Sequence, residues 1–379
     1  MNRKNPFVRI LLSPFATIYL FATWLRNQFF DWRLLPSTKF PIPVICIGNI
    51  AVGGTGKTPF TEYLIALLRK QYRVATLSRG YKRDTKGFIL VDANNTASEA
   101  GDEACQVKRK FPDIIVAVDG NRRRGIKKLL SLPAEGRPNV IILDDAMQHR
   151  YVTPSMTIML TDYNNLYFED FVLPAGNLRE SVKGAYRADI IIVTKCKDDI
   201  KPIDLRIIEK NMMLMANQNL YFSKIKYHTL EPLFPSLALH PCTLNEIEAN
   251  EDLLLIAGIA EPQPLIDIST KLNDHKLKAL NPRIKVFKFK DHHHFTPADI
   301  QCIDAGFQKM SAKKKRIITT EKDAVRLKSL PFLPENWKPF LYVLPVSIDF
   351  LYEQAEIFDA KVRTHVISTI NIYKKNARN

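Results

Sequence analysis

The stretch from Val44 to Pro59 reads Val-Ile-Cys-Ile-Gly-Asn-Ile-Ala-Val-Gly-Gly-Thr-Gly-Lys-Thr-Pro. An apolar run leads into a glycine-rich turn, and the helix-forming segment Phe60–Arg69 follows. In a strand, turn and helix of this kind, backbone N–H groups surround phosphate oxygens and the helix N-terminus favours negative charge. The stretch therefore predicts a nucleoside triphosphate site, and a tight turn without a ligand is the alternative.

The residues of this turn expected to bind a nucleotide are Gly53, Gly54, Thr55, Gly56, Lys57 and Thr58. The ammonium group of Lys57 would reach the β and γ phosphates, and the hydroxyl of Thr58 would bind Mg²⁺. The usual motif begins with a glycine where this chain has Ala51. Pro59 is compatible with a helix start, because N–H groups of the first turn have no partner within the helix.

Two adjacent carboxylates form a second candidate element of the site. Asp144 and Asp145 follow the apolar segment Val140–Leu143. Carboxylates at a strand end offer the hard oxygen ligands that Mg²⁺ prefers beside nucleotide phosphates. The alternative is that they cap a helix.

Short apolar runs rich in β-branched residues recur downstream, each followed by polar or helix-forming residues. The predicted strands are Val44–Ile47, Val74–Leu77, Ile114–Val118, Val140–Leu143, Thr157–Leu160, Ile190–Val193, Leu253–Ile256, Val286–Phe289, Arg316–Thr319 and Phe340–Leu344. Apolar strands alternating with helices are typical of an α/β protein with a doubly wound, mostly parallel sheet. Ligands of such folds bind at the carboxyl ends of the strands.

The pattern divides the chain into four expected parts. These are an N-terminal membrane-interface helix (residues 1–35), a P-loop domain (36–215), a connecting segment (216–250) where the alternation weakens, and a smaller α/β domain (251–379) that closes a cleft. The formal net charge of +16 favours an anionic partner such as nucleic acid, anionic lipid or a phosphorylated substrate. The five cysteines are scattered, without C-x-x-C spacing, which argues against a disulfide framework and favours a reducing, cytosolic site.

The N-terminal segment, residues 6–29, is apolar and aromatic, with arginines in and around it. Its uncharged part, Ile10–Leu25, is shorter than the ~20 residues that cross a bilayer, and Pro14 would kink it. No small-residue cleavage site follows, which argues against a cleaved signal. We expect a helix lying in the membrane interface; a short spanning helix and an ordinary core or partner-binding helix are the alternatives.

Several motifs together resemble those of the tetraacyldisaccharide 4′-kinase family of lipid A synthesis in Gram-negative bacteria. The segment Gly48–Pro59 resembles its phosphate loop, and Asp144–His149 resembles its Asp-Asp-Gly-Phe-Gln-His element, with Ala146 and Met147 in place of Gly and Phe. Further matching segments, in the family's order, are Ser78–Tyr81, Gly101–Glu103, Leu173–Glu180, Ala257–Ile259, Asp291–Phe295 and Thr320–Asp323. The resemblance extends from the N-terminal helix to about residue 326.

The resemblance implies transfer of the γ-phosphoryl group of ATP, with Mg²⁺, to the 4′-hydroxyl of a tetraacyldisaccharide 1-phosphate, giving lipid IVA. Such an enzyme would work at the cytoplasmic face of the inner membrane, bound to an anionic lipid surface. This agrees with the basic charge and the N-terminal helix. We expect a monomer and no nucleic-acid partner.

The resemblance also implies roles for individual residues. Asp102 would be the catalytic base, although a helix N-cap is its alternative. His293, matching the family's Asp-His-His element, would pair with Asp102, and His292 is the second choice. Arg122 would offset charge on the transferred phosphoryl group, against the alternative of a solvated basic run. Weaker candidates for contacts with the substrate are Arg79, Gln148 and Arg179.

Other functions fit the residues less well. Zinc at the three consecutive histidines is disfavoured, because they lack the spacing of H-E-x-x-H. A GTPase switch would need N-K-x-D, where this chain has Thr194-Lys195-Cys196-Lys197. A nucleic-acid-stimulated ATPase would need a continuous basic stripe with interleaved aromatic residues, and the sequence has none outside its N-terminal segment. A membrane-recruited nucleotide-binding module without kinase activity is the remaining alternative.

The segment 321–323, at the end of a predicted strand of the smaller domain, is a further candidate. It would either bind the nucleotide across the cleft or start a helix.

Overall fold

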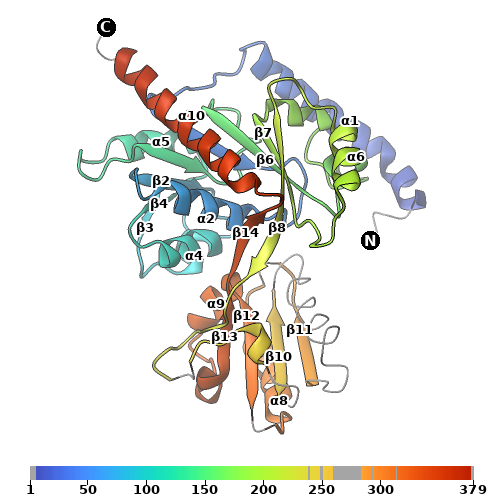
Figure 1. The fold of residues 1–379 in the computed structure, drawn as a ribbon, viewed down its shortest axis with the longest axis vertical. Coiled ribbons are helices and arrows are strands. Elements are labelled where there is room, and N and C mark those ends of the chain that lie inside the picture. Colours follow the sequence, from blue (N-terminus) through green and yellow to red (C-terminus); the bar gives the residue numbers. More distant parts are fainter. Residues whose placement is uncertain are drawn as a thin grey trace.

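The structure is a computed structural model that describes residues 6–237, 240–247, 251–258, 283–291, 293–312 and 314–376. It contains two sheets, one beyond the other along the long axis of the molecule (Figure 1). The larger, nine-stranded sheet has the order β14 (Val346–Phe350), β8 (Asn219–Tyr227), β7 (Ile190–Thr194), β6 (Met156–Asp162), β1 (Val44–Gly48), β5 (Val140–Leu143), β2 (Val74–Ser78), β4 (Ile115–Val118), β3 (Ile89–Val91). The smaller, five-stranded sheet has the order β11 (Arg283–Lys288), β10 (Asp252–Ala257), β12 (Lys315–Thr320), β13 (Leu341–Leu344), β9 (Glu231–Pro232).

Most neighbouring strands are parallel. Among the described strands, the antiparallel pairs are β3–β4 and β8–β14 at the two edges of the larger sheet and β9–β13 in the smaller one. The doubly wound, mostly parallel α/β fold predicted from the sequence is confirmed. Each predicted strand overlaps an observed one.

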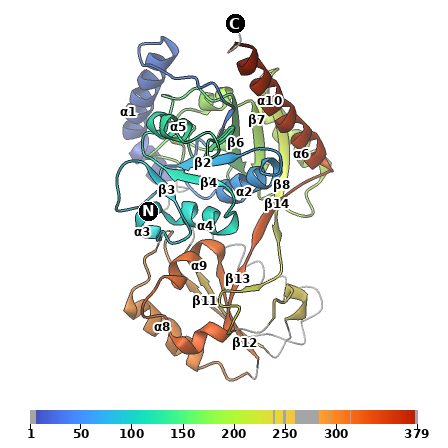
Figure 2. The same cartoon turned by 90° about the vertical axis from the view of Figure 1, so that its left-hand side faces the viewer.

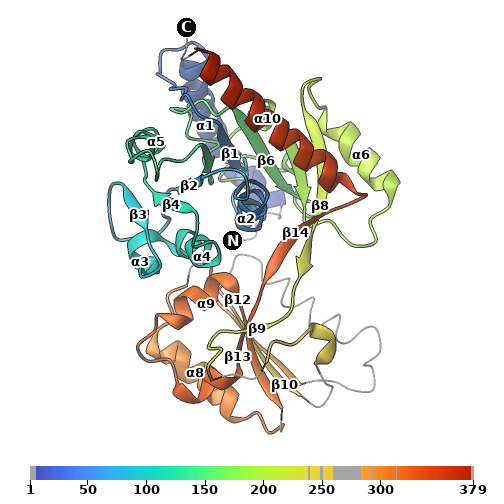
Figure 3. The same cartoon turned by 60° about the vertical axis from the view of Figure 1, so that its left-hand side comes forward.

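Helices cover both faces of the larger sheet. The α-helices in the described part of the chain are α1 (Pro6–Asp31), α2 (Lys57–Leu68), α3 (Ala97–Ala100), α4 (Asp102–Lys110), α5 (Arg122–Leu130), α6 (Pro202–Met212), α8 (Pro297–Gln308), α9 (Glu321–Lys328) and α10 (Gln354–Asn376). One apolar cluster joins the sheet to α2, α4 and α10, and a second joins it to α5 and α6. Figure 3 shows these helices around the sheet. Strands β1, β5 and β7 are buried along their whole length, which is why they read as continuous apolar runs.

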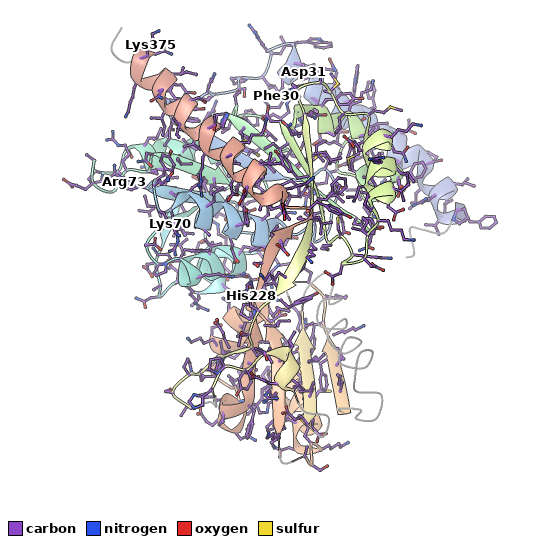
Figure 4. The ribbon with its side chains drawn as sticks, viewed as in Figure 1. Phe30, Asp31, Lys70, Arg73, His228 and Lys375 are labelled. Carbon is purple, nitrogen blue, oxygen red and sulfur yellow. The ribbon has the colours of Figure 1, made fainter. Side chains whose placement is uncertain are left out.

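The expected domain boundaries differ from the observed arrangement. Strand β8 falls in the expected connecting segment, and β14 and α10 in the expected smaller domain, yet all three belong to the larger sheet and its cover. The chain leaves the larger sheet after β8 and returns at β14, with which β8 pairs from Ser223–Phe350 to Tyr227–Val346. His228, labelled in Figure 4, lies where the chain passes between the sheets.

Helix α1 lies along the outside of the larger sheet, on the opposite side from α10 (Figure 2). It continues through Pro14 as one helix. One face contacts the protein from end to end: Arg9 lies 3.8 Å from Asp170, and the Tyr19 hydroxyl donates to the Arg179 carbonyl. Near its end, the Asn27 amide donates to a buried glutamate, Glu180.

The other face of α1 is apolar and exposed. Its exposed large side chains are Phe7, Ile10, Leu11, Phe15, Ile18, Phe21 and Trp24. In the described part of the chain, α1 is the one helix long and apolar enough to cross a membrane. Because its opposite face is docked, spanning a bilayer would require α1 to leave the protein.

Candidate active site

The phosphate loop joins β1 to α2 with two glycines in left-handed conformations. Gly53 has φ 115° and Gly56 has φ 80°, which side-chain-bearing residues rarely adopt. The loop is held from within, because the buried Asn49 amide donates to the Thr55 hydroxyl over 2.9 Å. It is also held from outside, because the Thr194 hydroxyl at the end of β7 donates to the Thr55 carbonyl over 2.9 Å. Thr55 therefore fixes the turn, while Gly53 and Gly54 are exposed.

The acidic pair lies beside this loop, because β5 pairs with β1 in the sheet. Lys57 Nζ lies 3.8 Å from an Asp145 carboxylate oxygen and 3.4 Å from Asn49 Oδ1. From the first turns of α2, the Thr61 hydroxyl donates to Asp144 over 3.3 Å. The predicted neighbourhood of lysine, carboxylates and glycine-rich turn is present in the fold.

The two carboxylates have opposite pKa shifts. Burial, and then the charge of Asp145, raise the pKa of Asp144 to about 6. Burial alone would raise the pKa of Asp145 as well, but Lys57 and Arg179 outweigh it and lower that pKa. Arg179 is within 3.1 Å of the Asp145 carboxylate. Both groups are thus mostly ionised at neutral pH.

The donor set at this place suits Mg²⁺. Asp144, Asp145 and Thr58 all offer oxygen atoms as ligands. Mg²⁺ prefers oxygen ligands and usually binds only a few protein groups, with phosphate and water as its other ligands. Among the described residues, no group of three or more His, Cys, Asp and Glu side chains could hold a metal. A dedicated protein cage of the zinc type is therefore not found in this part of the chain.

Arg122 is buried, so the alternative of a solvated charge is wrong for this residue. It begins α5, and its guanidinium donates to the carbonyls of Asp119, Asp144 and Asp145 over 3.2 to 3.5 Å. Asp145 itself has φ 45°. Arg122 thus holds the backbone that presents the acidic pair, and the compensation of charge on the transferred phosphoryl group, which the resemblance implies for this residue, stays a prediction.

Asp102 is the first residue of α4, and Gly101 occupies the N-cap. The Asp102 carboxylate is buried and accepts hydrogen bonds from Nε, at 3.0 Å, and Nη2 of Arg326. Arg326 belongs to α9, on the smaller sheet. The ion pair therefore crosses from one sheet's domain to the other's.

His293 has partners other than the predicted Asp102. Its Nε2 lies 2.9 Å from Asp299 Oδ2, and its ring stacks on Phe289 with centroids 4.6 Å apart. Asp299 also completes the capping box that starts α8 with Thr296. The local carboxylate, six positions along the chain, thus holds the imidazole in this conformation. His292, the second choice, lies outside the described residues.

The weaker candidates divide into two groups. The Gln148 amide donates to the Asn49 carbonyl over 2.7 Å and accepts from Arg179 over 3.4 Å, so both side chains support the phosphate loop and the acidic pair. Arg79 instead lines an open cavity of about 480 Å³. Its other cationic lining residues are Lys82, Arg83, Lys86 and Arg124. An anionic group of a substrate would be favoured there.

Three residues that organise the site were not predicted. Asn49 and Thr194 each stand at the carboxyl end of a predicted strand, and this position could have identified them. Arg326 carries no such signal. The expectation of a helix start at residues 321–323 is confirmed, since α9 begins there with Thr320 as its N-cap.

The parallel sheet, the loop between β1 and α2 and the acidic pair after β5 define the class of P-loop nucleotide-binding proteins. Within this class, the family model described as tetraacyldisaccharide-1-P 4′-kinase matches residues 8–366. The chain belongs to this family. It is therefore a kinase of lipid A synthesis, and the predicted family and enzyme class are confirmed.

Relatives and a solved structure support this assignment. The tetraacyldisaccharide 4′-kinase of Parabacteroides distasonis is 49% identical over 360 residues, 95% of each chain. That of Bacteroides thetaiotaomicron is 48% identical over 373 residues, 97% of this chain and 94% of the relative. A crystal structure of LpxK from Aquifex aeolicus in complex with ATP matches with a TM-score of 0.69 and 25% identity, over 94% of this chain and 99% of that one. The family assignment does not favour a GTPase-type switch or an inactive binding module.

Proposed function

We propose that this kinase transfers the γ-phosphoryl group of ATP to the 4′-hydroxyl of a tetraacyldisaccharide 1-phosphate, giving lipid IVA. The observation that carries the proposal is the meeting of three elements at one end of the larger sheet. Lys57 of the phosphate loop lies beside Asp145, and the charge of Glu103, next to Asp102, contributes to the raised pKa of Asp144. This charge interaction supports a position of the start of α4 near the acidic pair, and we infer that the proposed base Asp102 acts close to the nucleotide phosphates.

In this mechanism the chain positions charge and moves one proton. Backbone N–H groups of Gly53–Thr58 and the Lys57 ammonium hold the phosphates and stabilise charge that develops on the transferred group. Thr58, Asp144 and Asp145 would hold Mg²⁺, which when bound neutralises phosphate charge. Arg122 keeps the acidic pair in place through the carbonyls to which it donates.

The acceptor hydroxyl is a weak nucleophile until its proton is removed. Asp102 is proposed to accept this proton as the sugar oxygen attacks phosphorus. His293 is proposed to assist only after it exchanges Asp299 for Asp102, because its Nε2 is bound to Asp299 in this structure. Arg79, in the basic cavity, is a candidate for contacts with the substrate's phosphate or sugar.

The exposed face of α1 supports a location on a lipid surface. We infer that α1 lies in the interface of the inner membrane, on its cytoplasmic face, with its apolar side chains among the lipids and the docked face on the protein. The net charge of +16 would strengthen binding to anionic lipids. This placement lets an acylated sugar reach the site without leaving the membrane, and a monomer suffices for it.

The direct test is incubation of the protein with Mg-ATP and a tetraacyldisaccharide 1-phosphate, followed by mass spectrometry of the lipid. A bis-phosphorylated lipid is expected, and consumption of ATP without lipid phosphorylation would refute the proposal. Asp102→Ala should lower kcat by ~10²-fold or more if Asp102 is the base. Asp113→Ala is the matched control, because Asp113 is exposed and pairs with Arg69 at the surface.

A further inference from the structure

Charged side chains join the two sheets' domains between α4 and α9. The two helices lie side by side where the domains meet (Figure 3). Arg326 contacts Asp102, Lys322 contacts Glu103 over 2.9 Å, and Lys110 contacts Glu321 over 2.7 Å. The first of these pairs differs from the others because it is buried and contains the proposed catalytic base.

Residues of the smaller sheet's domain hold the Arg326 guanidinium in place through hydrogen bonds; we call this group of contacts the seat of Arg326. Nη1 donates to Asp323 Oδ1 over 2.8 Å and to the Gly258 carbonyl over 3.2 Å. Asp323 is fixed in turn, since its Oδ2 accepts from the Gly258 N–H and the Thr320 hydroxyl, each over 2.8 Å. A Cβ at position 258 would lie 2.9 Å from Asp323 Oδ1 and 3.4 Å from Arg326 Nη1. The close packing of this seat thus leaves no space for a side chain there.

The opposite edge of the same guanidinium is directed at Asp102. Nε and Nη2 both donate to Asp102 Oδ2, so a planar fork fixes the carboxylate as well as balancing its charge. Asp102 is 7% exposed, Arg326 6% and Asp323 0%, so two buried carboxylates share this cation. Removing Arg326 would take this cation away from two buried carboxylates, and the loss of one partner of a buried ion pair is strongly destabilising.

We propose that Arg326 is a positioning residue for phosphoryl transfer: it orients the Asp102 carboxylate, keeps it ionised, and makes both properties depend on the docking of the smaller sheet's domain. The inference rests on the proposed role of Asp102 as base. In the described part of the chain, other charged or titratable groups near Asp102 include Glu103 and Cys105 of α4 and Lys322 and Asp323 of α9. Arg326 supplies an oriented fork to the carboxylate, and the base is then competent only in the docked arrangement.

The test measures kcat, the KM for ATP and the pH profile of Arg326→Met. We expect kcat to fall by at least about tenfold, with little change in the KM for ATP, because the phosphate loop belongs to the other domain. Loss of an adjacent opposite charge raises the pKa of a carboxylate, so the acid limb of the rate profile should move to higher pH by about 1–3 pH units. Arg326→Lys should keep the acid limb near its wild-type position but lose part of kcat, because an ammonium group cannot form the fork.

Lys110→Met is the matched control. It removes a cation of the same interface whose contacts are Glu62 and Glu321, so one charged contact between the domains is lost while the contact of Arg326 with Asp102 stays in place. Its acid limb should not move. Added guanidinium should partly restore the rate of Arg326→Ala and have no such effect on Lys110→Met.

Three results would overturn the inference. One is a folded Arg326→Met enzyme with wild-type kcat and acid limb. The second is an equal loss of kcat in Arg326→Met and Lys110→Met with no shift of the limb. The third applies if Arg326→Met does not fold: wild-type kcat in Arg326→Lys, whose ammonium group cannot form the fork, would then overturn the inference. If Asp102→Ala is inactive, any of these three results refutes the role of Arg326 but not the role of Asp102 as base. Full activity of Asp102→Ala would refute both roles.

Discussion

The exposed face of α1 provides a quantitative test of membrane binding. Replacing Leu11, Phe15 and Ile18 together by serine removes apolar side chains that are 73%, 61% and 68% exposed. None of them belongs to the docked face, which contacts the protein through residues such as Tyr19 and Asn27. The fold should therefore be unaffected while the affinity for lipid falls.

The size of the effect follows from the exposed area. Full burial of such a side chain is worth about 2 kcal/mol, of which about two thirds is still available here, so three side chains give about 4 kcal/mol. A helix lying in the interface buries about half of this, or about 2 kcal/mol. We therefore expect the partition coefficient to fall by about 30-fold for shallow insertion, and by about 10³-fold for deep insertion.

Flotation with vesicles that contain anionic lipid measures the partition coefficient directly. The control replaces Ile357, Ile367 and Ile372 by serine, because these exposed side chains lie on α10, on the other side of the larger sheet (Figure 2). The control should bind vesicles as the unchanged protein does. Equal binding by the α1 variant and the unchanged protein, or an equal loss in both variants, would refute the interfacial placement of α1.

Two further predictions concern buried charges in the larger sheet's domain. Burial, and then the charge of Glu321, raise the pKa of Glu62 from its ordinary 4.5 to about 7, although Lys110 opposes this shift. Between these two pH values the native state therefore binds more protons than the unfolded state. Stability should therefore fall as pH rises from about 5 to 7, by up to about 1.4 kcal/mol per pH unit, and Glu62→Gln should flatten this slope in urea unfolding; equal slopes would contradict the assignment. Arg122→Lys should lower the free energy of unfolding by about 1–3 kcal/mol, because an ammonium group cannot reach the three carbonyls; an unchanged urea midpoint would show that these contacts contribute little.

Most of the predicted strands in the larger sheet are buried on both faces. A segment such as Val140–Leu143 is apolar at every position because helices cover both sides of it, and this signal is local. Strand β8 was missed because its second half, with Lys224 and Lys226, is less buried and mixes polar with apolar residues. Strand β14 follows β13 after one proline, and its partner lies far back in the chain. No local pattern tells which sheet such a strand joins.

The site shows the same limit. The phosphate loop is contiguous in sequence, so its residue types and spacing were sufficient to predict it. Arg326 lies 224 positions from Asp102, and only the docking of α9 on α4 brings them together. For His293 the nearby Asp299, already placed by the capping box, holds the imidazole in place of the distant aspartate. Long-range pairs between buried charges are the part that the sequence pattern did not contain.

The pairing of β8 with β14 has a consequence for how this enzyme could be taken apart. Tyr227 and Val346 are opposite each other in an antiparallel ladder, and the His228 N–H donates to the Pro345 carbonyl just beyond them. Topologically, everything from His228 to Pro345 is the loop of one β-hairpin. A two-residue Asn-Gly turn between Tyr227 and Val346 has the geometry to replace it. The shortened protein would keep the phosphate loop and the acidic pair but would lack Arg326. Nucleotide binding could then be measured separately from phosphoryl transfer.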